Sequence, residues 1–160
     1  MSDNLIRKQE AKDFDYLFML LSRMDKTATH MVINFLRELE QPDAARLKKI
    51  CDEDSVLDLT EIAINEEVVV IISRWQPVAN DLRMMLSAIK IAIAYERIGD
   101  YIHSNCRKLI FALENNIDLQ HLDLISLKKI GDRLVDVMHL VSEDLKNRTS
   151  DRVNKIKAED

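Results

Sequence analysis

The sequence predicts an all-α protein built from long helices. The chain of 160 residues contains only 2 Gly and 2 Pro, so residues that favour turns are scarce. Aromatic residues make up just 5% of the chain, and apolar residues recur at helical spacing over long stretches. A chain of this length suits one domain, with a hydrophobic core large enough to fold without disulfides.

Short polar breaks divide the chain into four predicted helices, which cover residues 5–40, 43–74, 77–115 and 122–147. Two breaks contain proline, QPD at 41–43 and QPV at 76–78. Each proline is expected in the first turn of the next helix, where its missing N–H is not needed. The third break is the Asn- and Asp-rich ENNIDLQHLD. A weaker one, NRTSD at 147–151, predicts that a fragment of a fifth helix follows it.

Each predicted helix carries apolar residues on one face, at alternating steps of three and four as in coiled-coil-like packing. In helix 5–40 these are Phe14, Leu17, Leu21, Met24, Ala28, Met31 and Phe35. In helix 43–74 they are Leu47, Ile50, Leu57, Ile64, Val68 and Ile71. In helix 77–115 they include Leu82, Met85, Ile89, Ala92, Cys106, Ile110 and Leu113. That helix is apolar on other faces too, which predicts a central position. Because the loops are short, neighbouring helices should be antiparallel.

Charge and cysteine content exclude several classes of protein. The formal net charge is -5, with 23 Lys and Arg against 28 Asp and Glu, and no basic stripe indicates nucleic-acid binding. Cys51 and Cys106 form no C-x-x-C motif and are expected to be reduced thiols of a cytoplasmic protein. The N-terminus lacks the apolar region of a secretory signal, and the longest apolar run is far shorter than the roughly 20 residues that span a bilayer. We therefore expect contact with a membrane only through partner proteins.

Two pairs of acidic residues interrupt the apolar faces of neighbouring helices. The segment AYERIGDYIH places Glu96 and Asp100 four residues apart, and DSVLD places Asp54 and Asp58 at the same spacing. If helices 43–74 and 77–115 fold back on each other near Gln76, all four residues fall within roughly 10 Å along the bundle. Residues four apart on a helix are neighbours, so the two pairs should converge on one patch.

Four carboxylates at this spacing predict a metal site. Carboxylates held close together must become protonated, move apart into solvent or bind a cation. Oxygen ligands suit magnesium, manganese, calcium or iron, and the metal is left open among these and zinc. Gly99, between Glu96 and Asp100, should let a neighbouring helix or a ligand approach closely. The simpler alternative is a solvated acidic face.

Two further residues near the predicted patch are weaker candidates for ligands. Glu61 lies on the same helix face but one turn further along. His103 follows Asp100 at the i+3 spacing, which is similar to the Glu-x-x-His motif of di-iron bundles. No second motif of that kind is present, so a packed histidine is the preferred interpretation.

The sequence contains no catalytic constellation. It has no glycine-rich phosphate loop, no nucleophile elbow and no paired Cys and His, so we expect a protein that is not an enzyme. The alternative from another class is a di-metal helical-bundle oxidoreductase or metal-storage protein. A third is a structural helical module with a solvated acidic face.

The segment SRWQPVANDLRMMLSAIKIAIAYERIGDYIHSNCRKLI resembles the PhoU family. The family signature is a helix start similar to RQPVASDLR, followed by ERIGD. The segment DAARLKKICDEDSVLDLTEIAI resembles the acidic second helix of that family. The resemblance is clear from Phe14 to about Asn115 and looser beyond.

The resemblance implies both a fold and a function. PhoU proteins are tandem three-helix bundles whose paired (E/D)xxxD motifs hold iron or other metals. They are negative regulators that link the phosphate ABC transporter to a sensor histidine kinase, and they are often dimers. Carried over by motif, the metal ligands would be Asp54, Asp58, Glu96 and Asp100.

The same resemblance divides the chain in two. Residues 5–116 would form one PhoU-like antiparallel three-helix bundle, and residues 122–160 would form the first part of an incomplete second bundle. The second bundle's own acidic motif would then be missing. Helix 122–147 would leave an apolar face to be covered by the same chain or by another subunit. That face comprises Leu124, Leu127, Ile130, Leu134, Val137 and Val141.

Overall fold

The computed structural model of the chain describes residues 2–119 and 123–158. Over these ranges it contains helices and no strands, which confirms the all-α prediction. The helices are α1 (Ser2–Glu38), α2 (Ala44–Asp52), α3 (Asp54–Trp75), α4 (Asn80–Glu114) and α5 (Leu124–Ala158).

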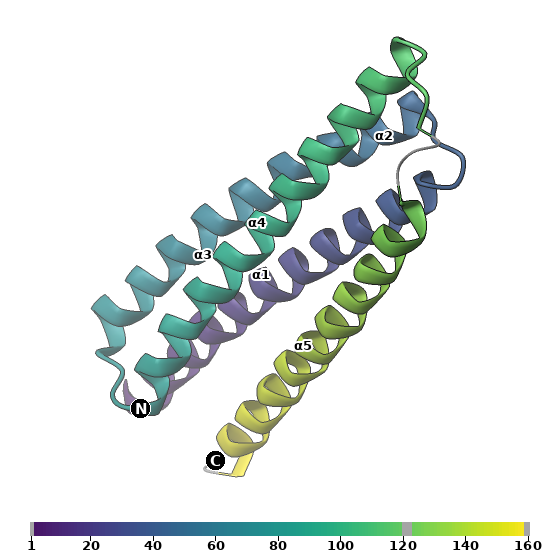
Figure 1. The fold of residues 1–160 in the computed structure, drawn as a ribbon. Helices are drawn as coiled ribbons and strands as arrows, with labels where there is room; N and C mark the ends of the chain where they lie inside the picture. Colours follow the sequence, from purple (N-terminus) through teal and green to yellow (C-terminus); the bar gives the residue numbers. More distant parts are fainter. Residues whose placement is uncertain (1, 120–122, 159–160) are drawn as a thin grey trace.

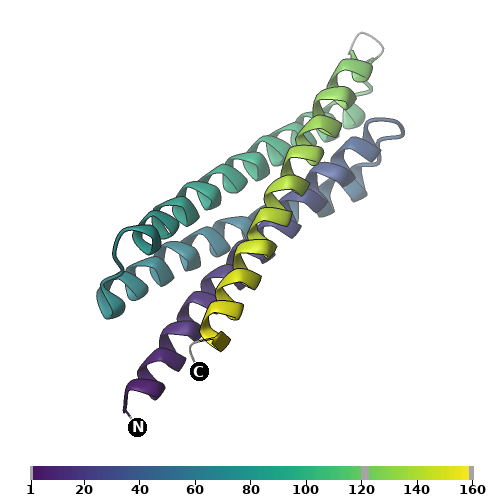
Figure 2. The same ribbon diagram turned by 90° about the horizontal axis from the view of Figure 1, so that it is seen from below.

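Helices α1, α3 and α4 pack against one another as a three-helix bundle (Figure 1). α3 and α4 run antiparallel and are joined by a tight turn, while α2 extends the line of α3 and packs on α4. α5 lies along α1 in the opposite direction, so the start of α1 and the end of α5 lie at the same end of the molecule (Figure 2). The predicted bundle with an additional C-terminal helix is confirmed.

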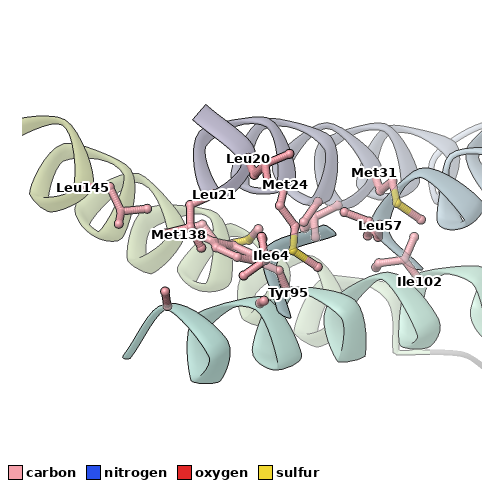
Figure 3. Close-up of a cluster of buried hydrophobic side chains, with 14 of the residues drawn as sticks. Leu20, Leu21, Met24, Met31, Leu57, Ile64, Tyr95, Ile102, Met138 and Leu145 are labelled. Atoms are coloured by element: carbon pink, nitrogen blue, oxygen red, sulfur yellow. The ribbon is translucent and has the colours of Figure 1, made fainter. Parts of the chain in front are cut away.

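The core is a continuous layer of aliphatic, methionine and aromatic side chains between the helices (Figure 3). The residues predicted for the apolar face of α1 are all buried. α1 contacts each of the other four helices, so it is at least as central as α4. A hydrogen bond between two buried polar groups links α4 to α1. The Tyr95 hydroxyl on α4 donates it to Oδ1 of Asp25 on α1, at 2.7 Å.

The predicted single helix 43–74 is wrong, because the chain breaks at Glu53 into α2 and α3. Glu53 keeps near-helical backbone angles of φ -72° and ψ -21°, and its N–H bonds to carbonyls two and three residues back. At the break, the Nδ1 atom of His30 on α1 lies 2.9 Å from a carboxylate oxygen of Glu53. This contact spans 23 residues, so local sequence signals do not reveal it.

The predicted break at 147–151 is also wrong. α5 continues without interruption through this segment to Ala158, so there is no separate fifth fragment after Asp151. Asn, Ser, Thr and Asp are only moderately poor helix formers, and without Gly or Pro they do not end a helix. The assignment of residues 122–160 to a second bundle stays a prediction.

The turn between α3 and α4 explains why the two helices fold back on each other. Gln76 adopts left-handed backbone angles of φ 45° and ψ 54°, and its N–H bonds to the carbonyl of Ile72, which closes α3. Ala79 also has a positive φ of 44°. Pro77 lies before α4 rather than in its first turn, and Pro42 likewise precedes α2, so both prolines terminate segments instead of starting them.

α5 packs on α1 of the same chain. This is one of the two alternatives predicted for the apolar face of helix 122–147, the other being contact with another subunit. At Gly131, an added Cβ would lie 2.3 Å from Cδ2 of Leu36, so glycine permits the close approach. Part of the predicted apolar face remains open to solvent: Ile130 is 67% exposed. A pocket of about 250 Å³ lies between α5 and α4, lined also by α1.

Candidate functional site

The two predicted acidic pairs lie on adjacent helices of the bundle. Asp54 and Asp58 occupy the first turns of α3, and Glu96 and Asp100 lie in the middle of α4. Asp54 is only 8% exposed, Glu96 is half-buried, and Asp58 and Asp100 are exposed. We call these four residues the acidic patch. The inner member of each pair therefore points toward the helix interface and the outer member toward solvent.

Gly99 sets how closely α3 and α4 approach at the acidic patch. A Cβ atom at this position would lie 2.3 Å from Cδ1 of Leu57 and 3.1 Å from Oδ1 of Asp54. Carbon atoms cannot approach that closely, so the contact requires a residue without a side chain. The close approach expected at Gly99 is confirmed.

Asp54 is buried with one oxygen paired and the other without a partner. Its Oδ2 atom pairs with Nδ1 of His103 on α4. Its Oδ1 atom is buried, and no hydrogen bond reaches it from the described residues. Asp54 is also the first residue of α3, where the helix dipole favours negative charge. An unpaired buried carboxylate oxygen is costly, so this atom is a natural ligand for an added cation.

The electrostatics show that the acidic residues are close enough to act on one another. Desolvation, followed by the carboxylates of Asp54 and Asp100, raises the pKa of Asp58 above its ordinary value. Desolvation and the neighbouring carboxylates, Asp100 first, also raise the pKa of Glu96. Both groups hold their protons more tightly than a free side chain, because burial disfavours the charged form and because ionising them adds charge to a crowded anionic surface.

Two residues that the sequence made weak candidates belong to this neighbourhood. Glu61 contributes to the raised pKa values of both Asp58 and Glu96, so it lies nearer than its position along the helix indicated. His103 is a half-exposed partner of Asp54 rather than a packed core histidine. The i+3 spacing from Asp100 was the only sequence signal for it.

The acidic patch has donors that fit a hard cation, but it is not arranged as a finished binding site. Among residues 2–119 and 123–158, no three His, Cys, Asp or Glu side chains already converge as metal ligands would. Carboxylates, an unpaired oxygen on Asp54 and the space kept by Gly99 fit an ion bound by oxygen atoms. Asp58 and Asp100 are exposed, so their side chains are free to turn toward such an ion.

A basic and aromatic surface adjoins the acidic patch on α4. It forms an open hollow whose lining includes Asp100 and His103 of the neighbourhood just described. Tyr101 and Phe111 are 71% and 60% exposed, which is unusual for aromatic side chains. The remaining lining residues are Arg97, Ser104, Arg107 and Lys108. Aromatic and arginine side chains are enriched where proteins bind other proteins.

Comparison with known proteins places this bundle in a family. A family model described as the PhoU domain matches residues 21–109, which contain the whole acidic patch. The chain belongs to the PhoU family. Its PhoU domain thus covers the second half of α1, all of α2 and α3, and most of α4.

Several proteins named PhoU or PhoU homolog are similar to this chain. It is 30% identical over 153 residues to the phosphate-specific transport system accessory protein PhoU homolog of Rhizobium meliloti, which covers 92% of this chain and 64% of that protein. It is 32% identical over 122 residues to the PhoU protein of Serratia marcescens, covering 76% and 49% of the two chains. The Escherichia coli PhoU protein is 30% identical over 122 residues, with the same coverage.

The chain spans about half to two thirds of the length of these PhoU relatives. The search of solved structures gave no significant match. Within the part of the PhoU chain that the structure describes, no helix is both long and apolar enough to cross a bilayer.

Proposed function

We propose that this PhoU-family chain regulates phosphate uptake and that its acidic patch binds metal ions. Proteins similar to it are named as accessory proteins of the phosphate-specific transport system, which supports the first part. The acidic patch supports the second part. Its crowded carboxylates, with one buried oxygen unpaired, are the observation that carries the proposal.

The metal would be held by the four carboxylates of the acidic patch, Asp54, Asp58, Glu96 and Asp100. Asp54 offers its unpaired Oδ1 atom, and His103 on the other oxygen holds the carboxylate in place. Iron, manganese, magnesium, calcium and zinc all remain open, because carboxylates accept each of them. A bound ion would offset part of the negative charge on this face of the bundle.

The partners would be components of the phosphate ABC transporter and a sensor histidine kinase, contacted in the cytoplasm. The chain would act by recognition rather than by catalysis, and as a negative regulator. The exposed aromatic and basic residues of α4 beside the patch are the surface we assign to this contact. Such a regulator works only if it binds one state of its partner more tightly than the other. We further propose that the chain forms a homodimer.

Equilibrium dialysis against Mn²⁺ or Fe²⁺ tests the metal site. The wild-type chain should bind ions at micromolar concentration, and the double variant Asp54→Asn with Glu96→Gln should lose binding. The matched control is Asp132→Asn with Asp136→Asn, because these residues form an exposed acidic pair at the same spacing on α5. Absence of binding by the wild-type chain would remove the metal site from the proposal.

The regulatory role is tested in a bacterial strain that lacks its own PhoU and carries a reporter of phosphate starvation. Expression of this chain should restore repression of the reporter when phosphate is plentiful. The variant Tyr101→Ala with Phe111→Ala should restore less repression while folding normally, since both side chains are exposed. A chain that leaves the reporter fully active would contradict the proposed role.

The presence of His103 at the acidic patch keeps a second candidate open, the di-metal oxidoreductase or metal-storage protein. That class needs imidazole ligands and redox chemistry with oxygen. To distinguish this class from a regulator, the chain is loaded with Fe²⁺ in the absence of oxygen and then exposed to air. Catalytic turnover or accumulation of many ions per chain would favour the alternative, and neither is expected for a regulator.

A further inference from the structure

The two cysteines of the chain lie next to each other although they are far apart in sequence. Cys51 is in the last turn of α2 and Cys106 is in the second half of α4, and these two helices pack together. Both thiols are free. The Cys51 thiol also donates a weak hydrogen bond of 3.8 Å to the carbonyl of His103, one turn before Cys106 on the same helix.

The environments of the two thiols differ in a way that matters for reactivity. Cys106 is fully buried, whereas Cys51 is half-buried and can be approached from solvent. Burial and the adjacent Cys51 thiol raise the pKa of Cys106 to about 12. The pKa of Cys51 is raised by burial, but its hydrogen bond with Cys106 opposes that rise. Cys51 is therefore the thiol that a dissolved reagent meets first.

We propose that Cys51 and Cys106 form a reversible disulfide, with a low-molecular-weight disulfide as the oxidant. A disulfide needs two cysteines that face each other at close range. The Cys51 sulfur lies 3.8 Å from the His103 carbonyl oxygen, one turn before Cys106, so the two cysteines face each other across the packed helices α2 and α4. In a reducing compartment such a bond is transient and serves as a redox-sensitive modification. It would fasten α2 to α4 close to the break at Glu53.

The reaction takes place in two exchange steps. The Cys51 thiol loses its proton, and its sulfur attacks one sulfur of the oxidant, whose other half leaves as a thiolate and takes up that proton. The Cys106 thiol then gives up its proton and attacks the Cys51 sulfur, which releases the second half of the oxidant as a thiol. The two protein thiols are oxidised to one disulfide, and the small disulfide is reduced to two thiols.

Oxidised glutathione, added to the folded full chain in mildly alkaline buffer, tests the proposal. N-ethylmaleimide is then added to alkylate any thiol that is still free. The expected result is that neither Cys51 nor Cys106 is alkylated. Peptide mapping should then show the Cys51 and Cys106 peptides joined within one chain. A thiol reductant should restore both thiols. Retention of two free thiols, a bond that forms only in denaturant, or a link between two chains would overturn the proposal.

Single variants test the order of attack. Cys106→Ser should accumulate glutathione on Cys51, because no second thiol can displace it. Cys51→Ser should leave Cys106 unmodified, because the remaining thiol is buried. The proposed roles would be overturned if Cys106 in the Cys51→Ser variant took up as much glutathione as Cys51 does in the Cys106→Ser variant. Circular dichroism should show that the helical content of both variants is unchanged.

Discussion

Asp54 on α3 and Gly99 on α4 face each other so closely that a Cβ atom on Gly99 would lie 3.1 Å from Oδ1 of Asp54. The same Cβ atom would lie 2.3 Å from Cδ1 of the fully buried Leu57. The glycine between the two acidic residues of α4 is thus a packing requirement of the helix pair. It lets a buried carboxylate and a buried leucine share one small space.

Gly99→Ala should destabilise the bundle by about 1 kcal/mol. Overpacking a core costs about 1–3 kcal/mol, while alanine in place of glycine gains about 1 kcal/mol of helix propensity. In a Leu57→Ala background the 2.3 Å clash is gone and only the 3.1 Å approach to Oδ1 of Asp54 remains, so the same substitution should become stabilising. Urea denaturation of the four proteins of this double-mutant cycle measures the change of sign. Equal effects in both backgrounds would show that Leu57 does not set the constraint.

Asp13→Asn should lower the free energy of unfolding at neutral pH by about 1–3 kcal/mol, because it breaks hydrogen bonds to a buried charge. Asp13 accepts bonds from Trp75 Nε1 at 3.0 Å and Arg74 Nη1 at 3.2 Å, which tie α1 to the end of α3. Chemical denaturation measures the loss. The exposed neighbour variant Asp15→Asn should change stability little.

The same residue predicts a dependence on pH. Burial opposes ionisation of Asp13, but hydrogen bonds from Gln9, Trp75 and Arg74 outweigh it and hold the pKa below its ordinary 3.8. A lowered pKa gives stability that is present above the unfolded value and is lost as pH falls through the folded value. The loss of stability in acid should be shallower in Asp13→Asn than in wild type. An unchanged acid limb in the denaturation curves would contradict this assignment.

Tyr95→Phe should destabilise the chain by about 1–3 kcal/mol. The substitution removes the hydroxyl that donates to Asp25, and leaves a buried carboxylate without that hydrogen bond. Thermal and urea denaturation check the effect. Tyr101→Phe is the matched control, because its side chain is 71% exposed and the substitution should be close to neutral.

Glu96→Gln should make the apo protein more stable at neutral pH. Desolvation and the neighbouring carboxylates raise the pKa of Glu96 above its ordinary 4.5. A raised pKa gives stability that is present below the unfolded value and is lost as pH rises through the folded value. Without this group, stability should fall less steeply as the pH rises above about 4.5, and the variant should be more stable than wild type at pH 7.

Urea denaturation at several pH values, in buffer containing a chelator, measures the effect of Glu96→Gln. Glu66→Gln on an exposed part of α3 should leave the profile unchanged. A profile of Glu96→Gln that follows the wild type throughout would mean that the carboxylates do not act on one another.

Much of the fold and the acidic patch was predictable from periodicity and turn residues. Gln76 and Pro77 mark the turn between α3 and α4, and once that turn is fixed, helical rise brings the two acidic pairs close together, with Asp54 opposite Gly99. The close approach at Gly99 followed from the residue type. These features depend on local signals that one stretch of sequence contains.

The features that sequence reasoning missed depend on contacts between distant segments. Glu53 breaks a helix while keeping near-helical angles, and its partner His30 lies on another helix. His103 pairs with Asp54 across 49 residues. The polar segment at 147–151 looked like a break, but residues of moderate propensity do not stop a helix that continues on both sides.

The single-sided packing of α5 makes the folding of this chain hierarchical. α5 rests along α1, and a pocket lies between it and α4, so its removal disturbs none of the contacts among the other helices. Cooperative unfolding needs shared burial, and among residues 2–119 and 123–158 α5 packs closely against α1 and no other helix. The chain therefore holds a module that detaches at a lower opening free energy than the rest. Amide hydrogens of α5 should exchange through that partial opening, and those in the middle of α4 only through complete unfolding.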